Sequence, residues 1–364
     1  RSLPVLSGKK SDLNEVELST FKSNISSGVM SVMIGHLAVP AFEPKKNLPS
    51  SLSEKVVSEL LQNKMRFKGL VVTDAMNMKS ITKNFSNAEA AVLAIKAGND
   101  VILFPENEDD SYFGILDAVK TGDIDEERIN QSVRKVLLLK KWVNLDSEKF
   151  TDVEKMKKSV GAFSSRQIAK KIAEKSITIV KNKNGIIPIR QCLKTKYAHY
   201  SLLDSETSNA AASFEQWLND RLVNIKNITL PLKSKDKSYT EAVDSAKDAD
   251  VIILSVYVKV RDYKGSVTLA QNQEKFINSI MKLQKPVILL SHGNPYLLMN
   301  FPDVDAYLCN YGDIHVSEKA LEEAIFGEKT ISGILPVSIP NSGYAAGSSM
   351  ILEKSTLSVD ASGL

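Results

Sequence analysis

Three polar residues stand directly or almost directly after short apolar segments of the sequence. They are Asp74, His36 and Glu106. In α/β barrels the catalytic groups lie at the carboxyl ends of parallel strands. A carboxylate at such a position loses hydration, which is costly unless it has partners or a chemical role. These three side chains are therefore the first candidates for a catalytic site.

Each candidate also has a structural interpretation. The residue pattern favours catalysis by Asp74 and capping of a helix from Ala75 to a similar degree. For His36, a satisfied structural position is favoured over a substrate contact, because histidine has an intermediate burial preference. Glu106 begins the acidic run 106–110, which favours a solvated loop. Asp74 is accordingly the strongest of the three candidates.

The rest of the sequence offers no second catalytic set. His199, His292 and His315 lie beside aromatic residues or in turn and loop segments. No Ser-His-Asp set, glycine-rich phosphate loop or metal-type His/Glu spacing is present. Cys192 and Cys309 have no CxxC neighbour, so neither a zinc site nor a disulfide framework is expected, although one long-range bridge stays open.

The bulk composition is that of an ordinary globular protein. The 364 residues suffice for two domains, and the net charge of +4, spread along the chain, implies no nucleic-acid or membrane partner. The sequence has no apolar run of transmembrane length and no signal peptide. Because it begins with Arg1 rather than Met, we expect the true N-terminus to be missing. Periplasmic, secreted and cytoplasmic locations stay open.

Helical and extended patterns alternate in the first part of the chain. Apolar residues at helical spacing, followed by short apolar runs, predict helix-to-strand units. Strands separated by amphipathic helices indicate a parallel sheet buried on both faces. The expected strands are 29–34, 70–73 and 100–104, and the expected helices are 16–27, 51–64, 88–96 and 125–141.

A second α/β domain follows a segment without periodicity. We predict the domains 1–145 and 166–340, joined by a linker at 146–165. The second domain is expected to begin with a helix over 167–175 and to contain the strands 177–181, 251–256 and 287–290. Residues 341–364 are rich in Gly, Ser and Ala and predict an exit linker or tail.

Four stretches along the chain form recognisable motifs: 31–40 (SVMIGHLAVP), 69–78 (GLVVTDAMNM), 122–134 (GDIDEERI and SVR) and 176–182 (SITIVKN). In this order they resemble glycoside hydrolase family 3, and most closely its β-N-acetylglucosaminidase (β-N-acetylhexosaminidase) branch. The resemblance extends to about Pro340. It implies an α/β fold, the C-terminal part of a (β/α)8 TIM-like barrel followed by an α/β/α sandwich.

The resemblance also implies a chemistry for these residues. Asp74 would attack the anomeric carbon and form a covalent glycosyl-enzyme intermediate, so that two inversions give retention. Met33 and His36 would line the sugar subsite, and His36 in place of an aromatic residue favours the N-acetylglucosaminidase branch. The implied substrates are terminal β-N-acetylglucosamine residues of peptidoglycan or chitin-type fragments. No metal or organic cofactor is expected.

The chain departs from the family pattern at its beginning. The family has an early half-barrel, a Lys-His sugar-binding pair and an Asp-His acid/base dyad just before a Leu-Pro. Here Leu3-Pro4 resembles the tail of that loop, so the acid/base residue would lie upstream of Arg1. We expect this segment alone to be inactive unless the rest of the barrel is supplied, by a second chain for example. A fused C-terminal domain is a further possibility suggested by some relatives.

Two alternatives stay open at this point. One is a β-glucosidase or β-xylosidase of the same family, which a panel of aryl glycosides separates from the first reading. The other is a non-catalytic module in which a truncated barrel and a sandwich serve carbohydrate binding or assembly. The absence of an acid/base loop favours the module, whereas the presence of Asp74 favours an enzyme.

Overall fold

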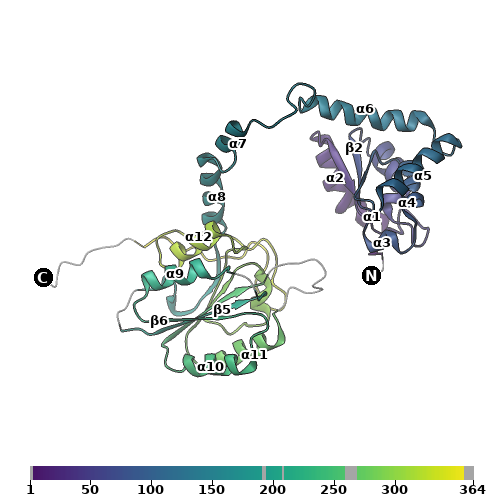
Figure 1. Cartoon of the computed structure of the whole chain (residues 1–364). Helices are drawn as coiled ribbons and strands as arrows, with labels where there is room; N and C mark the ends of the chain where they lie inside the picture. Colours follow the sequence, from purple (N-terminus) through teal and green to yellow (C-terminus); the bar gives the residue numbers. More distant parts are fainter. Residues whose placement is uncertain (1–2, 191–193, 207–208, 259–268, 356–364) are drawn as a thin grey trace. The chain divides into compact units, whose positions relative to one another are not determined.

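The chain forms two compact units, with the division in the sequence between Asp152 and Val153 (Figure 1). The computed structural model describes residues 3–190, 194–206, 209–258 and 269–355. The division lies inside the predicted linker, but that segment is not irregular throughout. It contains helix α7 (Val153–Ser159) and the start of α8 (Phe163–Ser176). Because α7 buries none of its residues, it lacks the apolar periodicity by which a helix is predicted.

Unit 1 is built around a three-stranded parallel sheet. Strands β1 (Ser31–Ile34), β2 (Leu70–Ala75) and β3 (Val101–Leu103) lie in the order β1-β2-β3. The three predicted strands are thus present, with boundaries shifted by one or two residues. The largest consequence of that shift is that β2 continues through Asp74 to Ala75.

Helices alternate with these strands and cover one face of the sheet. In β1, Val32 and Ile34 are buried against this helical layer, whereas Met33 is 57% exposed. Within the described part of unit 1, the prediction that the sheet is buried on both faces is therefore wrong. The helices are α1 (Lys10–Glu15), α2 (Glu17–Ser26), the 3-10 helix η1 (Ser50–Leu52), the π-helix η2 (Lys55–Lys64), α3 (Lys79–Thr82), α4 (Asn87–Ala97), α5 (Glu108–Lys120) and α6 (Glu126–Trp142).

Part of the apolar face of helix α6 is exposed to solvent, as is the open face of the sheet. Its apolar stripe of Ile129, Val133, Val136 and Leu137 has helical spacing and predicts a buried face. In the structure Val133 and Leu137 are 46% and 57% exposed. The spacing identified the helix correctly, and Ile129 packs against a cluster of Ile95, Ala118 and Ile124, whereas Val133 and Leu137 stay exposed.

Unit 2 contains a six-stranded sheet in the order β4-β9-β8-β7-β5-β6. All neighbouring pairs are parallel except β4 and β9, which are antiparallel. The sequence pattern did not predict β5, β6 or β9. In β5 the fully buried polar residues His199 and Ser201 interrupt the apolar run. The strands are β4 (Thr178–Asn182), β5 (Tyr197–Leu203), β6 (Ile225–Leu230), β7 (Val251–Tyr257), β8 (Val287–Ser291) and β9 (Ala306–Cys309).

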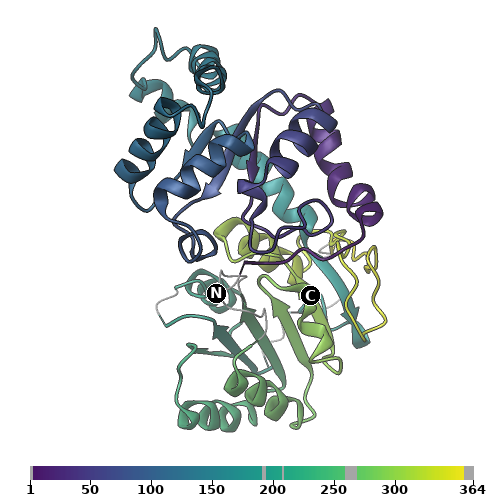
Figure 2. The same cartoon turned by 90° about the vertical axis from the view of Figure 1, so that its right-hand side faces the viewer.

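Helices cover both faces of this sheet, which makes unit 2 a three-layer α/β/α sandwich (Figures 1 and 2). Helices α8, α9 (Ala212–Arg221) and α12 (His315–Ile325) pack on one face. Helices α10 (Asp236–Ala246) and α11 (Gln271–Met281) pack on the other. The short 3-10 helices η3 (Lys183–Gly185) and η4 (Pro295–Met299) lie in connections. No helix in the described ranges is long and apolar enough to cross a membrane.

The described part of the predicted tail packs on unit 2. Leu352 pairs with Ile331, and the backbone N–H of Met350 donates to the carbonyl of Ile179 in β4. Residues 341–355 therefore differ from the exit linker that their composition predicts. Gly343 and Gly347 have φ values of +79° and +87°, so these glycines serve turns rather than a flexible spacer.

Buried histidines make the stability of unit 2 depend on pH. His199 Nδ1 lies 2.7 Å from Asn227 Oδ1, and Nε2 lies 2.8 Å from Ser255 Oγ. Burial lowers the pKa of His199 from 6.5 to about 4, and that of His292 to about 3. Since the unfolded chain then binds more protons, stability is full above pH 6.5 and falls as the pH drops toward these values.

We expect His199→Gln to flatten this dependence. Between pH 7 and pH 4.5 the free energy of unfolding in urea should fall by about 2–3 kcal/mol more for the parent than for the variant. This amount follows from the two pH units between 6.5 and 4.5, at about 1.36 kcal/mol each. His315→Gln, at an exposed position at the start of α12, is the matched control and should behave as the parent. An equal loss in parent and His199→Gln would contradict the prediction.

Candidate active site

Asp74 lies at the carboxyl end of the central strand of unit 1. The strand begins at Leu70 beside β1, and Gly69 permits this approach because a Cβ there would stand 2.4 Å from the carbonyl oxygen of Met30. Asp74 is half-buried, and its Oδ1 accepts a hydrogen bond from the N–H of Ala75 at 2.8 Å. The next helix, α3, begins only at Lys79. Asp74 is thus a strand residue, and the helix-cap interpretation does not describe it.

The side chain of Asp74 belongs to the open face of the sheet. Val71 and Thr73 have no exposed surface and point toward the helices. Side chains alternate along a strand, so Asp74 points to the opposite face. Met33 pairs with Val72 in the parallel register and is exposed on that same face. The structure therefore brings two of the predicted site residues, Met33 and Asp74, to one surface.

His36 is held inside the protein by both ring nitrogens. It is 3% exposed, its Nδ1 lies 2.6 Å from Ser51 Oγ, and its Nε2 lies 3.0 Å from the carbonyl oxygen of Ala75. Burial lowers the pKa of His36, and the Ala75 carbonyl and the Asp74 carboxylate offset only part of this effect. Sequence reasoning missed Ser51, since nothing distinguishes it from the neighbouring serines.

Glu106 does not join these residues. It is exposed in the loop between β3 and α5, and Asn107 beside it caps α5 by accepting from the N–H of Asp110. Phe104, at the carboxyl end of β3, has a φ of +44° and is 67% exposed. A bulky residue in this region of backbone space is uncommon, and its carbonyl is held by the N–H of Asn77.

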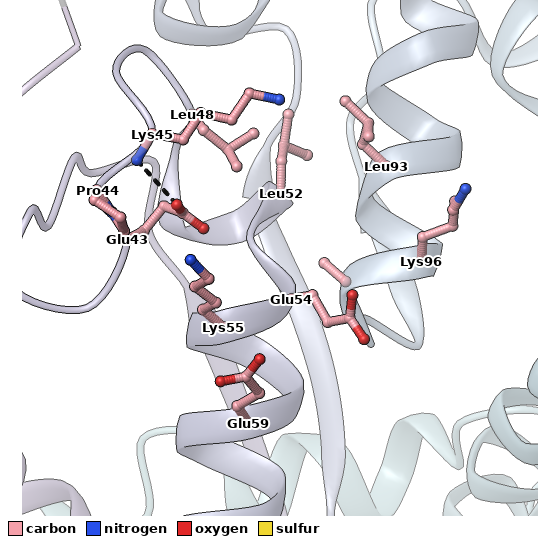
Figure 3. Close-up of a pocket in the computed structure, with 11 residues that line it drawn as sticks. Glu43, Pro44, Lys45, Leu48, Leu52, Glu54, Lys55, Glu59, Leu93 and Lys96 are labelled. Atoms are coloured by element: carbon pink, nitrogen blue, oxygen red, sulfur yellow. Dashed lines mark hydrogen bonds between the residues drawn. The ribbon is translucent and has the colours of Figure 1, made fainter.

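Unit 1 contains two cavities that bear on the candidate site. One of about 570 Å³ is formed by the loop after β1, the start of η2 and helix α4 (Figure 3), and contains none of the predicted site residues. Burial would raise the pKa of Glu43 in this pocket, but hydrogen bonds from Ser53 and from the Lys45 N–H outweigh it and lower the pKa. The other cavity, of about 280 Å³, is apolar and runs along the edge strand β1, where Met33 lines it with Leu18 and Phe21 of α2.

No metal centre is formed by the residues whose positions are described. No group of three His, Cys, Asp or Glu side chains there is close enough to hold an ion. The arrangement that remains is a carboxylate at a parallel strand end, beside a buried histidine, in a chain that continues into an α/β/α sandwich. These features define an α/β protein with a carboxylate at the carboxyl end of a parallel strand, the position that catalytic groups occupy in β/α barrels.

Comparison with known proteins identifies the family. Residues 1–139 match the glycosyl hydrolase family 3 N terminal domain, and residues 78–350 match the glycosyl hydrolase family 3 C-terminal domain. The chain belongs to glycosyl hydrolase family 3. The predicted fold, part of a TIM-like barrel followed by an α/β/α sandwich, is confirmed by solved structures of this family.

Three similar proteins illustrate the range of the relatives. A β-N-acetylglucosaminidase/β-glucosidase from Cellulomonas fimi is 23% identical over 87% of this chain and 59% of its own length. A putative β-xylosidase from Formosa agariphila is 28% identical over 79% of this chain and 41% of its own. A fungal multi-domain β-N-acetylglucosaminidase structure has a TM-score of 0.80 at 26% identity, covering 94% of this chain and 40% of that one. The chain thus spans about half the length of these relatives.

Proposed function

We propose that this chain carries the nucleophile of a retaining exo-β-N-acetylhexosaminidase that removes terminal β-N-acetylglucosamine residues, and that Asp74 is that nucleophile. The observation that carries the proposal is the position of Asp74. It stands within β2, at the carboxyl end of a parallel strand, and its side chain points to the open face of the sheet. The names of two of the relatives above, the protein from Cellulomonas fimi and the fungal β-N-acetylglucosaminidase, support the substrate class.

The reaction proceeds in two displacements at one carbon. A carboxylate oxygen of Asp74 bonds to the anomeric carbon while the bond to the aglycone oxygen breaks, and that oxygen takes a proton from a general acid. Water then attacks the same carbon, gives its proton to the group that acted as the acid and releases Asp74, so the product keeps the β-configuration. We propose that the general acid comes from the units that complete the barrel.

We propose further that additional β/α units complete the sheet of unit 1. Strands β1 and β3 are its edges, and one face carries the exposed side chain of Met33. Unpaired edges and open apolar faces favour association. The units that complete the barrel would come from the rest of the polypeptide or from a second chain, and a further fused domain fits the same scheme. The non-catalytic alternative applies if neither supplies them.

Covalent trapping tests the nucleophile directly. A ring-fluorinated N-acetylglucosaminyl fluoride has a leaving group that needs no protonation, and its ring fluorine slows hydrolysis of the intermediate. We expect mass spectrometry of the full-length protein to find one sugar on the peptide that contains Asp74, and none after Asp74→Asn. A sugar attached to another carboxylate would overturn the assignment.

The second candidate is a β-glucosidase or β-xylosidase, which the similarity to the putative β-xylosidase favours. It differs from the first only in the sugar that the site accepts. Aryl β-N-acetylglucosaminide, β-glucoside and β-xyloside compared at equal concentration separate the two. Equal or faster turnover of the sugars without an acetamido group would favour the second candidate.

A further inference from the structure

A buried serine-rich turn joins the ends of neighbouring strands in unit 1. Residues 50–53, mostly in η1, are all buried. Ser50 Oγ donates to the carbonyl of Gly35 after β1 at 2.7 Å, and Ser53 Oγ donates to Glu43 at 2.7 Å. Burying three hydroxyl groups in one turn costs free energy unless each of them forms a hydrogen bond. The partner of the third, Ser51, is His36.

The partners of His36 determine its tautomer. The carbonyl of Ala75 can only accept, so His36 Nε2 must carry the proton that it donates at 3.0 Å. In the neutral ring Nδ1 is then an acceptor, and it receives the hydroxyl proton of Ser51 at 2.6 Å. Both nitrogens are therefore committed to protein partners. Either would have to release its partner before it could bind a sugar hydroxyl.

Ser51 is in turn fixed from the third strand. The side-chain amide of Asn99, which has no exposed surface and precedes β3, donates to the carbonyls of Ser51 and Ala94 at 2.8 Å each. A chain of hydrogen bonds therefore runs from Asn99 through Ser51 and His36 to Ala75. It connects the segment before β3 to the carboxyl ends of β1 and β2.

The last link of this chain is adjacent to the carboxylate. The backbone N–H of Ala75 donates to Asp74 Oδ1, and the carbonyl of Ala75 accepts from His36. Given the function proposed above, we infer that His36 is a positioning residue: by holding Ala75 through Nε2–H, it fixes the backbone and the carboxylate orientation of Asp74. A misplacement of the reacting atom by 1 Å costs about 10²-fold in rate.

Paired substitutions separate the two hydrogen bonds of His36. In His36→Gln the amide nitrogen can reach the Ala75 carbonyl, as Nε2 does. In His36→Asn the shorter amide can meet Ser51 but not Ala75. We expect His36→Asn to lower kcat by about 10- to 100-fold with KM changed less than about 2-fold, and His36→Gln to retain most of the parent's kcat. Ser51→Ala leaves the Nε2–H bond to Ala75 in place and should therefore resemble His36→Gln, and Ser53→Ala, in the same turn but not bonded to His36, is the control.

The measurements are made on the full-length protein with an aryl β-N-acetylglucosaminide, together with trapping of the covalent adduct. If the parent forms no adduct on Asp74, the proposed function itself fails. If the adduct forms but both His36 variants raise KM at unchanged kcat, His36 contacts the sugar and the positioning role is overturned. Equal loss of kcat in His36→Gln and His36→Asn would also overturn it.

A measurement on the parent keeps the inference testable if the variants do not fold. Nitrogen NMR distinguishes a protonated from an unprotonated ring nitrogen, and the chain has only 4 histidines to assign. We expect His36 at pH 7 to be neutral, with Nε2 protonated and Nδ1 bare. An Nδ1–H tautomer, with Nε2 bare, would remove the bond to Ala75 and overturn the inference.

Discussion

Asp74→Asn should reduce the hydrolysis of an aryl β-N-acetylglucosaminide by about 10³-fold or more, because an amide cannot form the glycosyl ester. The substitution keeps the size of the side chain and an oxygen that can accept from the Ala75 N–H. Stability should therefore change little compared with activity. The measurement is kcat/KM of the full-length protein and the variant, with thermal unfolding of both recorded alongside.

Glu106→Gln is the matched control for this experiment. It removes a carboxylate near the same end of the sheet, but from an exposed loop position after β3. We expect it to leave kcat/KM within about 2-fold of the parent.

A second check of Asp74 is the variant Asp74→Ala with added azide, which can enter the space left by the carboxylate and give an α-glycosyl azide. Parent-like activity of Asp74→Asn would show that Asp74 is structural.

The strands of unit 1 could be predicted because their apolar runs are short and bounded by glycine or proline. What the sequence did not predict is which side of each strand is covered. The run before Asp74 has the composition of a strand buried on both faces, yet Val72 is only half-buried whereas Val71 is fully buried. The composition of a strand shows that it can be buried on both faces. Whether both faces are buried depends on other segments that pack against them, and these lie far away in the sequence.

In the candidate site, the sequence identified residues but not their contacts. Asp74 was found because a carboxylate after an apolar strand is unusual and because it stands in a family motif. The partners of His36 are 15 and 39 positions away, and their meeting depends on the parallel pairing of β1 and β2. No local pattern encodes that meeting. The resemblance placed His36 at the sugar, whereas its hydrogen bonds join it to Ser51 and to the backbone of the strand that carries Asp74.

A second carboxylate, Asp100, supports the same strand from its other end. Its side chain has no exposed surface, and Oδ2 accepts from the backbone N–H of Val71 at 2.9 Å and from Lys135 Nζ at 2.8 Å. Oδ1 accepts from Ser132 Oγ at 2.7 Å and lies 3.4 Å from Arg128 Nη1. One carboxylate thus fixes the beginning of β2 and two turns of α6.

Asp100→Ala should lower the free energy of unfolding of unit 1 by about 3 kcal/mol, because it leaves two cations and a strand N–H without their anion. This value is at the lower end of the cost of breaking a buried ion pair, because the side chains of Arg128 and Lys135 are 21% and 27% exposed and water can hydrate them in part.

The control is Asp123→Ala. It removes a contact of 2.6 Å with Lys96, and the side chains of Asp123 and Lys96 are 53% and 44% exposed. A pair that exposed contributes less than about 1 kcal/mol. Urea unfolding of the parent and the two variants measures both losses. Equal losses of unfolding free energy would mean that Asp100 contributes only a solvated ion pair. A loss larger by about 2 kcal/mol or more in Asp100→Ala would show that Asp100 aligns β2, and with it Asp74.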